Sequence, residues 1–398
     1  MDGLLGVFTQ GTFFYFFIVA AIFAIGDFAG VATKAKLSAV FVALLLFLVG
    51  FMSGALPPDI IKKAGLTDFG AMTSALLVFH MGTMINIKQL IQEYKTVITA
   101  ILSMVVVMLA VLAVSPIIGM KNAITTIPVL NGGIISTQIM TSGAQKAGLL
   151  IPAALATILY AIKKFAGSYP ASFFGVKEAK IILEEYRANK LVLSTTDSKA
   201  TEAPVKEGFA DRNKKYFTDF VCIAVSVCFA WIAVSLGKLT PINFSIWALL
   251  SGAVLGYFRF VPERILEKGK TSGILSMLVF AIIVPSLAKV TFNDLLTMGF
   301  YMIVILGASL AALYLVFYIL PGWKIRGSKN LAMGIALGQF LGFPATFLIA
   351  NEVAKAVTDD EKEQEAVLAV IMPSYVVAGL ATVTTFSIVI AGIFVNFL

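Results

Sequence analysis

Apolar runs of about 20 residues recur along the whole chain and limit its fold more than any other feature. Of the 398 residues, 59% are hydrophobic and only 13% are charged, whereas soluble domains have about 25% charged residues. We therefore expect an all-α polytopic membrane protein, because a helix satisfies its own backbone hydrogen bonds in lipid. The predicted spans cover residues 10–30, 37–55, 67–86, 96–118 and 148–172, and then 217–237, 243–260, 271–289, 295–320 and 364–396.

Two further stretches, 121–146 and 329–355, are too polar and too broken to cross a bilayer in one pass. Each begins with Lys-Asn, is interrupted near a glycine in its middle, and ends in a lysine. The sequence Asn131-Gly132-Gly133 divides the first stretch into two arms, each about 18 Å long as a helix. Such an arm can reach the middle of a hydrocarbon core about 30 Å thick. We predict that both stretches are re-entrant hairpins, which require protein or water around their backbone.

The order of these segments divides the chain into two halves of the same plan. Residues 1–172 form the first predicted repeat, with its hairpin at 121–147, and residues 216–398 form the second, with its hairpin at 329–356. The polar stretch 173–215 joins them; its start can extend a helix, and its later part is typical of a flexible linker. The predicted fold has two inverted repeats of five transmembrane helices, each with a re-entrant hairpin before its fifth helix.

An odd number of spans per repeat gives the two repeats opposite orientations, and the positive charges agree with this arrangement. With the N-terminus outside, 24 of the 30 Lys and Arg residues fall on the predicted inner side. Eleven of them belong to the central linker region, in which Lys163 and Lys164 are counted. Because cytoplasmic loops carry an excess of Lys and Arg, we expect both termini outside, the linker in the cytoplasm, and a bacterial-type inner (plasma) membrane.

The middle of each predicted hairpin brings two opposite helix ends together. The first arm ends with unpaired carbonyl groups, which suit Na⁺, and the second begins with unpaired amides, which suit a carboxylate. Close packing between helices is the alternative role for each small residue there. We predict a substrate site formed by Asn131, Gly132, Gly133, Ser136, Thr137, Gln339, Gly342, Pro344 and Thr346. We predict a Na⁺ site formed by Asn131, Ser136, Thr137, Thr346 and Asn351.

Several kinds of chemistry lack the residues that they need. The acidic residues fall mainly in loops or at span ends, and we expect neither a carboxylate pair nor a buried lysine at the centre of a span. The chain has no Walker-type loop and no convincing Ser/His/Asp set, so we expect neither an ATP-driven pump nor an enzyme. No cofactor and no metal other than Na⁺ as the coupling ion are expected. We interpret the single histidine, His80, as a helix-packing residue, with a proton or substrate role as the alternative.

The residues at the two breaks also carry a family resemblance. The first hairpin contains Gly132-Gly133-Ile134-Ile135-Ser136-Thr137, and residues 338–346 of the second contain Gly, Pro and Thr. Together with five spans per repeat, these stretches resemble the sodium/glutamate symporter family and the related 2-hydroxycarboxylate symporters. The family's first hairpin has Gly-Gly-His-Gly-Thr, and this chain keeps the glycines but lacks the histidine. The second keeps elements of Gly-x-Gly-Ala-Thr-Pro-Thr in altered order. The resemblance implies sodium-coupled transport of glutamate or a related carboxylate.

We therefore expect a secondary active transporter that couples symport of a small carboxylate or amino acid, such as glutamate, to Na⁺ by alternating access. A passive ion or solute channel is one alternative, and an exporter or proton-coupled carrier is another. The expected partners are a small anionic or zwitterionic substrate and the lipid bilayer. A homodimer is compatible with this plan. No nucleic acid is expected, because the net charge of +8 arises from loop residues.

Glycine at each break gives a specific expectation about mutation. Glycine can adopt positive φ and lets a ligand approach bare amides, so alanine at Gly133 or Gly342 should abolish transport. Gly252 falls in an ordinary predicted span, where alanine should leave most of the transport intact.

Overall fold

The computed structural model describes residues 11–32, 39–85, 87–188, 208–343 and 345–398, and within these ranges it contains helices and no strand. The first half comprises α2 (Thr12–Ala32), α3 (Ala39–Met52), α4 (Ile60–Lys63), α5 (Thr67–Thr83), α6 (Ile87–Gln92), α7 (Tyr94–Ala113), α8 (Ser115–Ile118), α9 (Met120–Leu130), α10 (Ile134–Lys146) and α11 (Leu150–Arg187). The second half comprises α12 (Phe209–Arg212), α13 (Asp219–Leu239), α14 (Phe244–Tyr257), α15 (Ile265–Lys268), α16 (Ser272–Ile283), η1 (Val284–Leu287), α17 (Phe292–Tyr314), η2 (Leu315–Ile319), η3 (Pro321–Ile325), α18 (Lys329–Leu341), α19 (Ala345–Val357), α20 (Glu361–Leu380), η4 (Ala381–Phe386), α21 (Ser387–Phe394) and η5 (Val395–Phe397).

The apolar runs form helices where the sequence predicts them, and many of these helices have the length and composition of a membrane span. In the described ranges, six helical segments are long and apolar enough to cross a membrane: α2, α7, α11, α13, α17 with η2, and the segment from α20 to η5. The helices α3 and α14 and the segment formed by α16 and η1 are apolar but shorter. Within the described residues the prediction of an all-helical fold is therefore confirmed, and six of its helical segments are long and apolar enough to be candidate membrane spans.

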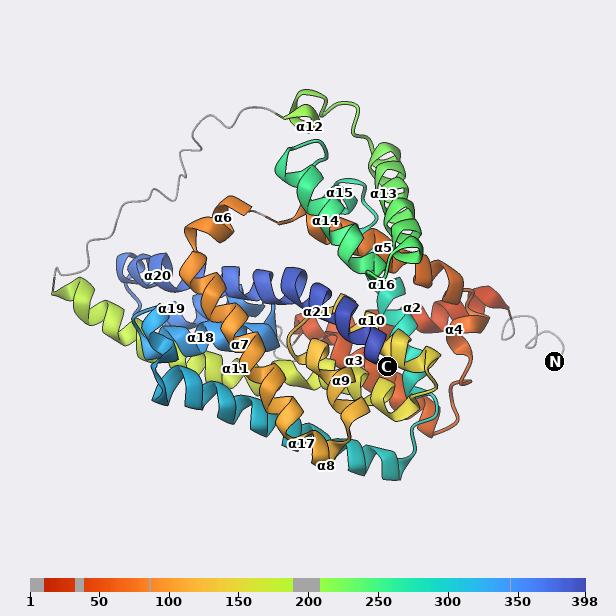
Figure 1. Cartoon of the computed structure of the whole chain (residues 1–398), viewed down its shortest axis with the longest axis horizontal. Coiled ribbons are helices and arrows are strands. Elements are labelled where there is room, and N and C mark those ends of the chain that lie inside the picture. Colours follow the sequence, from red (N-terminus) through yellow and green to blue (C-terminus); the bar gives the residue numbers. More distant parts are fainter. Residues whose placement is uncertain (1–10, 33–38, 86, 189–207, 344) are drawn as a thin grey trace.

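The helices build two hydrophobic cores, and each core draws on both halves of the chain. One core lies mainly among α2–α5 and α13–α16, which we call the outer unit, with α10 and α21 packed against it. The other lies among α7–α11 and α17–α20, which together with α21 we call the hairpin unit. Figure 1 shows α13 and α14 of the outer unit standing away from the body that holds α11, α17 and α18. Both broken stretches belong to the hairpin unit.

The outer unit is held by a close crossing of α5 and α14. A Cβ atom on Gly252 would lie 3.0 Å from the Cα atom of Gly82 and even closer to the carbonyl oxygen of Phe79. Small residues permit this approach of two backbones, as they do at many helix contacts in membranes. The assumption that Gly252 is an ordinary position is therefore wrong, because an added methyl group would force the two helices apart.

His80 lies in the same region and is buried at the C-terminal end of α5. Its Nδ1 atom accepts a hydrogen bond of 3.3 Å from the backbone N–H of Leu266 in α15. The imidazole thus joins two elements of the outer unit. This contact supports the interpretation of His80 as a helix-packing residue.

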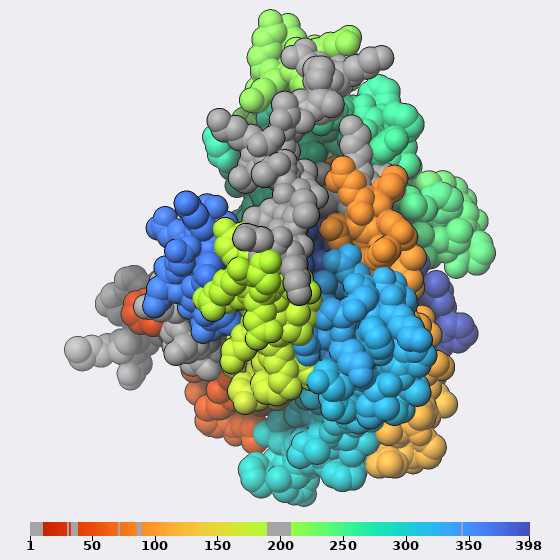
Figure 2. Space-filling model, turned by 90° about the vertical axis from the view of Figure 1, so that its left-hand side faces the viewer, coloured from red at the N-terminus to blue at the C-terminus, as the bar shows by residue number. Residues whose placement is uncertain are grey.

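The long helix α11 runs through the hairpin unit and continues past residue 172 into the predicted linker. At its C-terminal end, the Nε atom of Arg187 lies 2.7 Å from Oε1 of Glu363 in the first turn of α20. Figure 2 shows this yellow-green end of α11 beside blue segments of the C-terminal half. Near the other end of the hairpin unit, Nζ of Lys121 donates to the carbonyl oxygens of Phe397 (3.0 Å) and Leu398 (2.8 Å).

Candidate functional site

The first broken stretch consists of α9 and α10, which meet at a buried break. The helix α9 ends at Leu130, and α10 begins after Gly133, whose backbone is extended (φ −99°, ψ −159°). The hydroxyl groups of Ser136 and Thr137 donate to the carbonyl oxygen of Gly133 at 3.0 and 2.9 Å. Both side chains are fully buried. The expectation of positive φ is wrong for Gly133, because its φ lies in a range open to other residues.

The second broken stretch consists of α18 and α19 and turns at Gly342. This residue has φ +70° and ψ +172°, a conformation that is essentially restricted to glycine. Its carbonyl oxygen accepts a hydrogen bond of 3.1 Å from the backbone N–H of Thr346 in the first turn of α19. Thr346 is buried, whereas Pro344 lies outside the described residues.

Both breaks pack against one side chain, Val383. A Cβ atom on Gly133 would lie 2.6 Å from Cγ1 of Val383, and one on Gly342 would lie 3.0 Å from its Cγ2. Val383 belongs to η4, a π-helical turn between α20 and α21. Such turns are rare and often occur at functional sites. The two predicted hairpins, whose glycines are more than 200 residues apart in sequence, therefore lie against the same side chain.

A lysine of α11 also joins the two breaks. Lys163 is 1% exposed. Its Nζ atom donates to the backbone carbonyl oxygens of Val129 (2.7 Å), Leu130 (3.1 Å), Gly132 and Gln339 (3.1 Å). The expectation that no buried lysine lies inside a span is therefore wrong. Lys163 also does not belong with the exposed linker charges, among which the charge count placed it.

The position of Lys163 has a simple electrostatic cause. The carbonyl groups that it contacts lie at the C-terminal ends of α9 and α18, where helices leave carbonyls unpaired and carry negative partial charge. Unpaired carbonyls at the end of a first arm are the kind of group expected to suit Na⁺, although the residues predicted for the Na⁺ site are Asn131, Ser136, Thr137, Thr346 and Asn351 and not those that contact Lys163. The close packing of α11 brings the amine to them, since a Cβ atom on Gly167 would lie only 2.7 Å from Cβ of Phe340. The amine of Lys163 thus lies at the helix ends where a sodium ion was expected.

Buried polar atoms without a partner surround the breaks. The side-chain oxygens Oδ1 of Asn131, Oε1 of Gln339 and Oγ1 of Thr346 have no hydrogen-bond partner in the described structure. Asn131 and Gln339 are 0% exposed, and Thr346 is 1% exposed. Buried polar atoms are nearly always paired in proteins, and an unpaired one requires an explanation such as a ligand or an ion. Three such oxygens on residues at or beside the two breaks favour a binding site over ordinary packing.

The structure does not bring every predicted residue to this point. Asn351 lies five residues beyond Thr346 in α19, about 7.5 Å along the helix axis. Its Nδ2 atom donates to the carbonyl oxygen of Phe347 at 2.9 Å. In the described ranges, no group of three His, Cys, Asp or Glu side chains is arranged to hold a metal ion.

Sequence reasoning missed Lys163 and Val383. A signal for Lys163 was present, because it falls inside the predicted span 148–172, and an ionisable residue inside a span indicates a functional site. Nothing in the sequence marks Val383, an apolar residue within a run of threonines.

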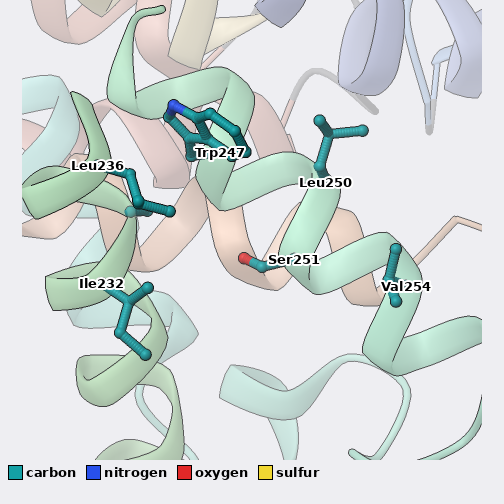
Figure 3. Close-up of a pocket in the computed structure, with 7 residues that line it drawn as sticks. Ile232, Leu236, Trp247, Leu250, Ser251 and Val254 are labelled. Carbon is teal, nitrogen blue, oxygen red and sulfur yellow. The ribbon is translucent and has the colours of Figure 1, made fainter. Parts of the chain in front are cut away.

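A cavity of about 250 Å³ lies elsewhere, between α13 and α14 of the outer unit (Figure 3). Its lining is apolar apart from Ser251, and the hydroxyl group of Ser251 donates to the carbonyl oxygen of Ala248 at 3.0 Å. This cavity offers no charged group to an anionic ligand, so it does not compete with the breaks as a candidate site.

The breaks therefore combine features that suit a small anion. Two helix N-termini, those of α10 and α19, begin beside them, and helix N-termini attract negative charge. The amine of Lys163 lies beside the same breaks, and the unpaired hydroxyl group of Thr346 can donate to an anion, whereas the unpaired amide oxygens of Asn131 and Gln339 can only accept. Comparisons with models of known protein families and with curated proteins find no match for this chain.

Proposed function

We propose that this chain is a secondary active transporter for a small carboxylate or amino acid, with glutamate among the candidates. The observation that carries the proposal is the convergence of both helix breaks on Val383 and Lys163 within an apolar helical bundle. Broken helices at membrane depth occur where their free backbone groups bind a ligand or line a cavity. In the proposal, the two breaks form the substrate site near the middle of the membrane.

The division into two units supports alternating access. The hairpin unit holds the site, and it would move against the outer unit to open the site to either side in turn. A small polar contact joins Thr157 of α11, in the hairpin unit, to η1, which directly follows α16 of the outer unit. The Oγ1 atom of Thr157 lies 2.9 Å from Oγ of Ser286 in η1 and 3.3 Å from Oγ1 of Thr141 in α10. Such hydroxyl contacts can exchange partners at low cost during a movement.

The contacts at the two ends of the hairpin unit support the proposed orientation. Lys121, which was assigned to the outer side, contacts the C-terminus, which was also assigned outside. Arg187 and Glu363, at regions assigned to the cytoplasm, form an ion pair. Because segments of like assignment lie together, we propose that the hairpins enter the membrane from opposite sides, with both termini outside and the linker in the cytoplasm.

A carrier is favoured over a channel by the closure of the site. Asn131 and Gln339 are completely buried, and both glycines pack against Val383. A channel needs a continuous path along its filter, whereas a carrier passes through closed states of this kind. The coupling cation expected from the sequence is Na⁺, and carbonyls of the kind expected to suit it contact Lys163.

Thermal unfolding of the purified protein with a panel of small carboxylates and amino acids tests the proposed function. A ligand that binds only the folded state raises the melting temperature, by an amount that corresponds to about 2.7 kcal/mol at 100 times its Kd. We expect at least one anionic or zwitterionic compound to stabilise the parent and not a Gly342→Ala variant. A Gly307→Ala variant serves as control, because no atom lies within 4 Å of a Cβ added there. Stabilisation of all three proteins alike would place the binding site elsewhere.

A further inference from the structure

We propose that the side chain of Lys163 replaces the coupling sodium ion, so that this chain transports its substrate without Na⁺. The inference rests on the proposed function and concerns the cation at the same site. It follows from the position of one amine among backbone carbonyls of both hairpins.

The oxygen atoms around Nζ of Lys163 form a cation site rather than an ordinary lysine contact. An ammonium group has three protons to donate, yet four carbonyl oxygens lie within hydrogen-bond distance. Three of the carbonyls come from the end of the first hairpin's first arm, and the fourth comes from the equivalent arm of the second. In the described part of the chain, no ion pair joins Lys163 to a carboxylate. A charge on this amine would therefore be balanced by carbonyl dipoles alone.

Hard oxygen ligands of this kind are also those that bind alkali and alkaline-earth cations. In the proposal Lys163 is protonated and supplies the same unit charge, attached to α11 by a flexible chain. A sodium ion could enter these carbonyls only if the amine left them. The amine and the ion are therefore mutually exclusive at this point.

The neighbouring lysine shows that the arrangement is specific. Nζ of Lys164 lies 5.3 Å from the centre of the Tyr160 ring and has no hydrogen bond to the carbonyls at the breaks in the described structure. Lys163 and Lys164 are adjacent, carry the same charge and belong to the same helix. They therefore form a matched pair for mutation, one inside the carbonyl site and one outside it.

A fixed cation has a functional consequence. The site keeps its positive charge when the substrate leaves, so binding of an anionic substrate does not require a second ion to arrive first. A carrier of this type would use a gradient other than that of Na⁺, such as the gradient of its own substrate or of a solute exchanged for it.

The test compares thermal unfolding of the purified parent, Lys163→Ala and Lys164→Ala in NaCl, KCl and choline chloride at equal ionic strength. We expect the melting temperature of the parent to be the same in all three salts. The melting temperature of Lys164→Ala should likewise not depend on the salt. Lys163→Ala should melt lower than the parent in choline chloride, because its carbonyls lose their cation, and should regain part of the loss in NaCl. A Na⁺-dependent rise in the melting temperature of the parent would overturn the proposal, and so would a folded Lys163→Ala variant that is indifferent to Na⁺.

Two further measurements keep the proposal testable if Lys163→Ala does not fold. Lys163→Met keeps most of the side-chain volume without the charge and should show the same Na⁺-dependent gain. The parent in proteoliposomes should exchange its substrate equally in sodium-free and sodium-containing media, and loss of exchange without Na⁺ would contradict the proposal. Absence of exchange in both media, with an unchanged salt response in the melting experiments, would count against the transport function and not against the cation site.

Discussion

Replacement of Gly342 by alanine should disable transport while the helical fold is retained. Gly342 has φ +70° and ψ +172°, and a residue other than glycine in this conformation costs about 1–3 kcal/mol. The added Cβ atom would also lie 3.0 and 3.1 Å from the two methyl groups of Val383, and overpacking of this kind costs about 1–3 kcal/mol. Together the two effects amount to about 2–6 kcal/mol.

The strain should raise mainly the free energy of the conformational state in which both breaks pack against Val383. If only 2 kcal/mol falls on that state, a transport cycle that passes through it slows by about 30-fold. Uptake into proteoliposomes and the melting temperature in detergent measure the two effects separately. We expect transport to fall by at least this factor, with a lower melting temperature and normal membrane insertion.

The control for this experiment is Gly307→Ala in α17, where an added methyl group meets no atom within 4 Å. Alanine in an exposed helix position is neutral or stabilises by up to about 1 kcal/mol. Equal transport by Gly342→Ala and Gly307→Ala would show that the turn at Gly342 is not part of the transport site.

Three further predictions concern the first break, the outer unit and the orientation of the chain. Gly133→Ala should lose transport through its contact with Val383, and Val383→Ala in the same chain should restore part of it; loss without rescue would rule out this contact as the cause. Gly252→Ala should reduce the melting temperature by forcing α5 and α14 apart, and a melting temperature like that of the parent would show that the crossing can relax. A reporter fused after Leu398 should be active outside the cell and one inserted near residue 201 inside, and activity of both on one side would exclude the inverted orientation.

The positions of the helices were predictable from the sequence because apolar runs and their interruptions depend on local composition. The runs became α2, α7, α13 and α17 within a few residues of their expected ends, and the breaks near Gly133 and Gly342 lie where glycines interrupt a polar stretch. The continuation of α11 beyond residue 172 was also foreseen, since its charged residues can extend a helix at a surface.

The partners of individual residues were less predictable because they depend on tertiary packing. The sequence shows Lys163 beside Lys164 and gives no way to tell which amine meets the carbonyls of distant helices. It likewise gives no indication that Gly252 crosses Gly82, since glycine is common in membrane helices. The sodium prediction placed a cation at the helix ends and did not foresee that the amine of Lys163 lies against the carbonyls there.

Counterflow in proteoliposomes tests the central claim most directly. Vesicles that contain the purified protein are loaded with an unlabelled carboxylate or amino acid that raises its melting temperature, and are then diluted into a trace of the labelled compound. A carrier exchanges one molecule for another, so labelled solute should rise transiently above its equilibrium level inside the vesicles, and Gly342→Ala should abolish the rise. A simple approach to equilibrium with no overshoot would indicate a passive pore and contradict the account.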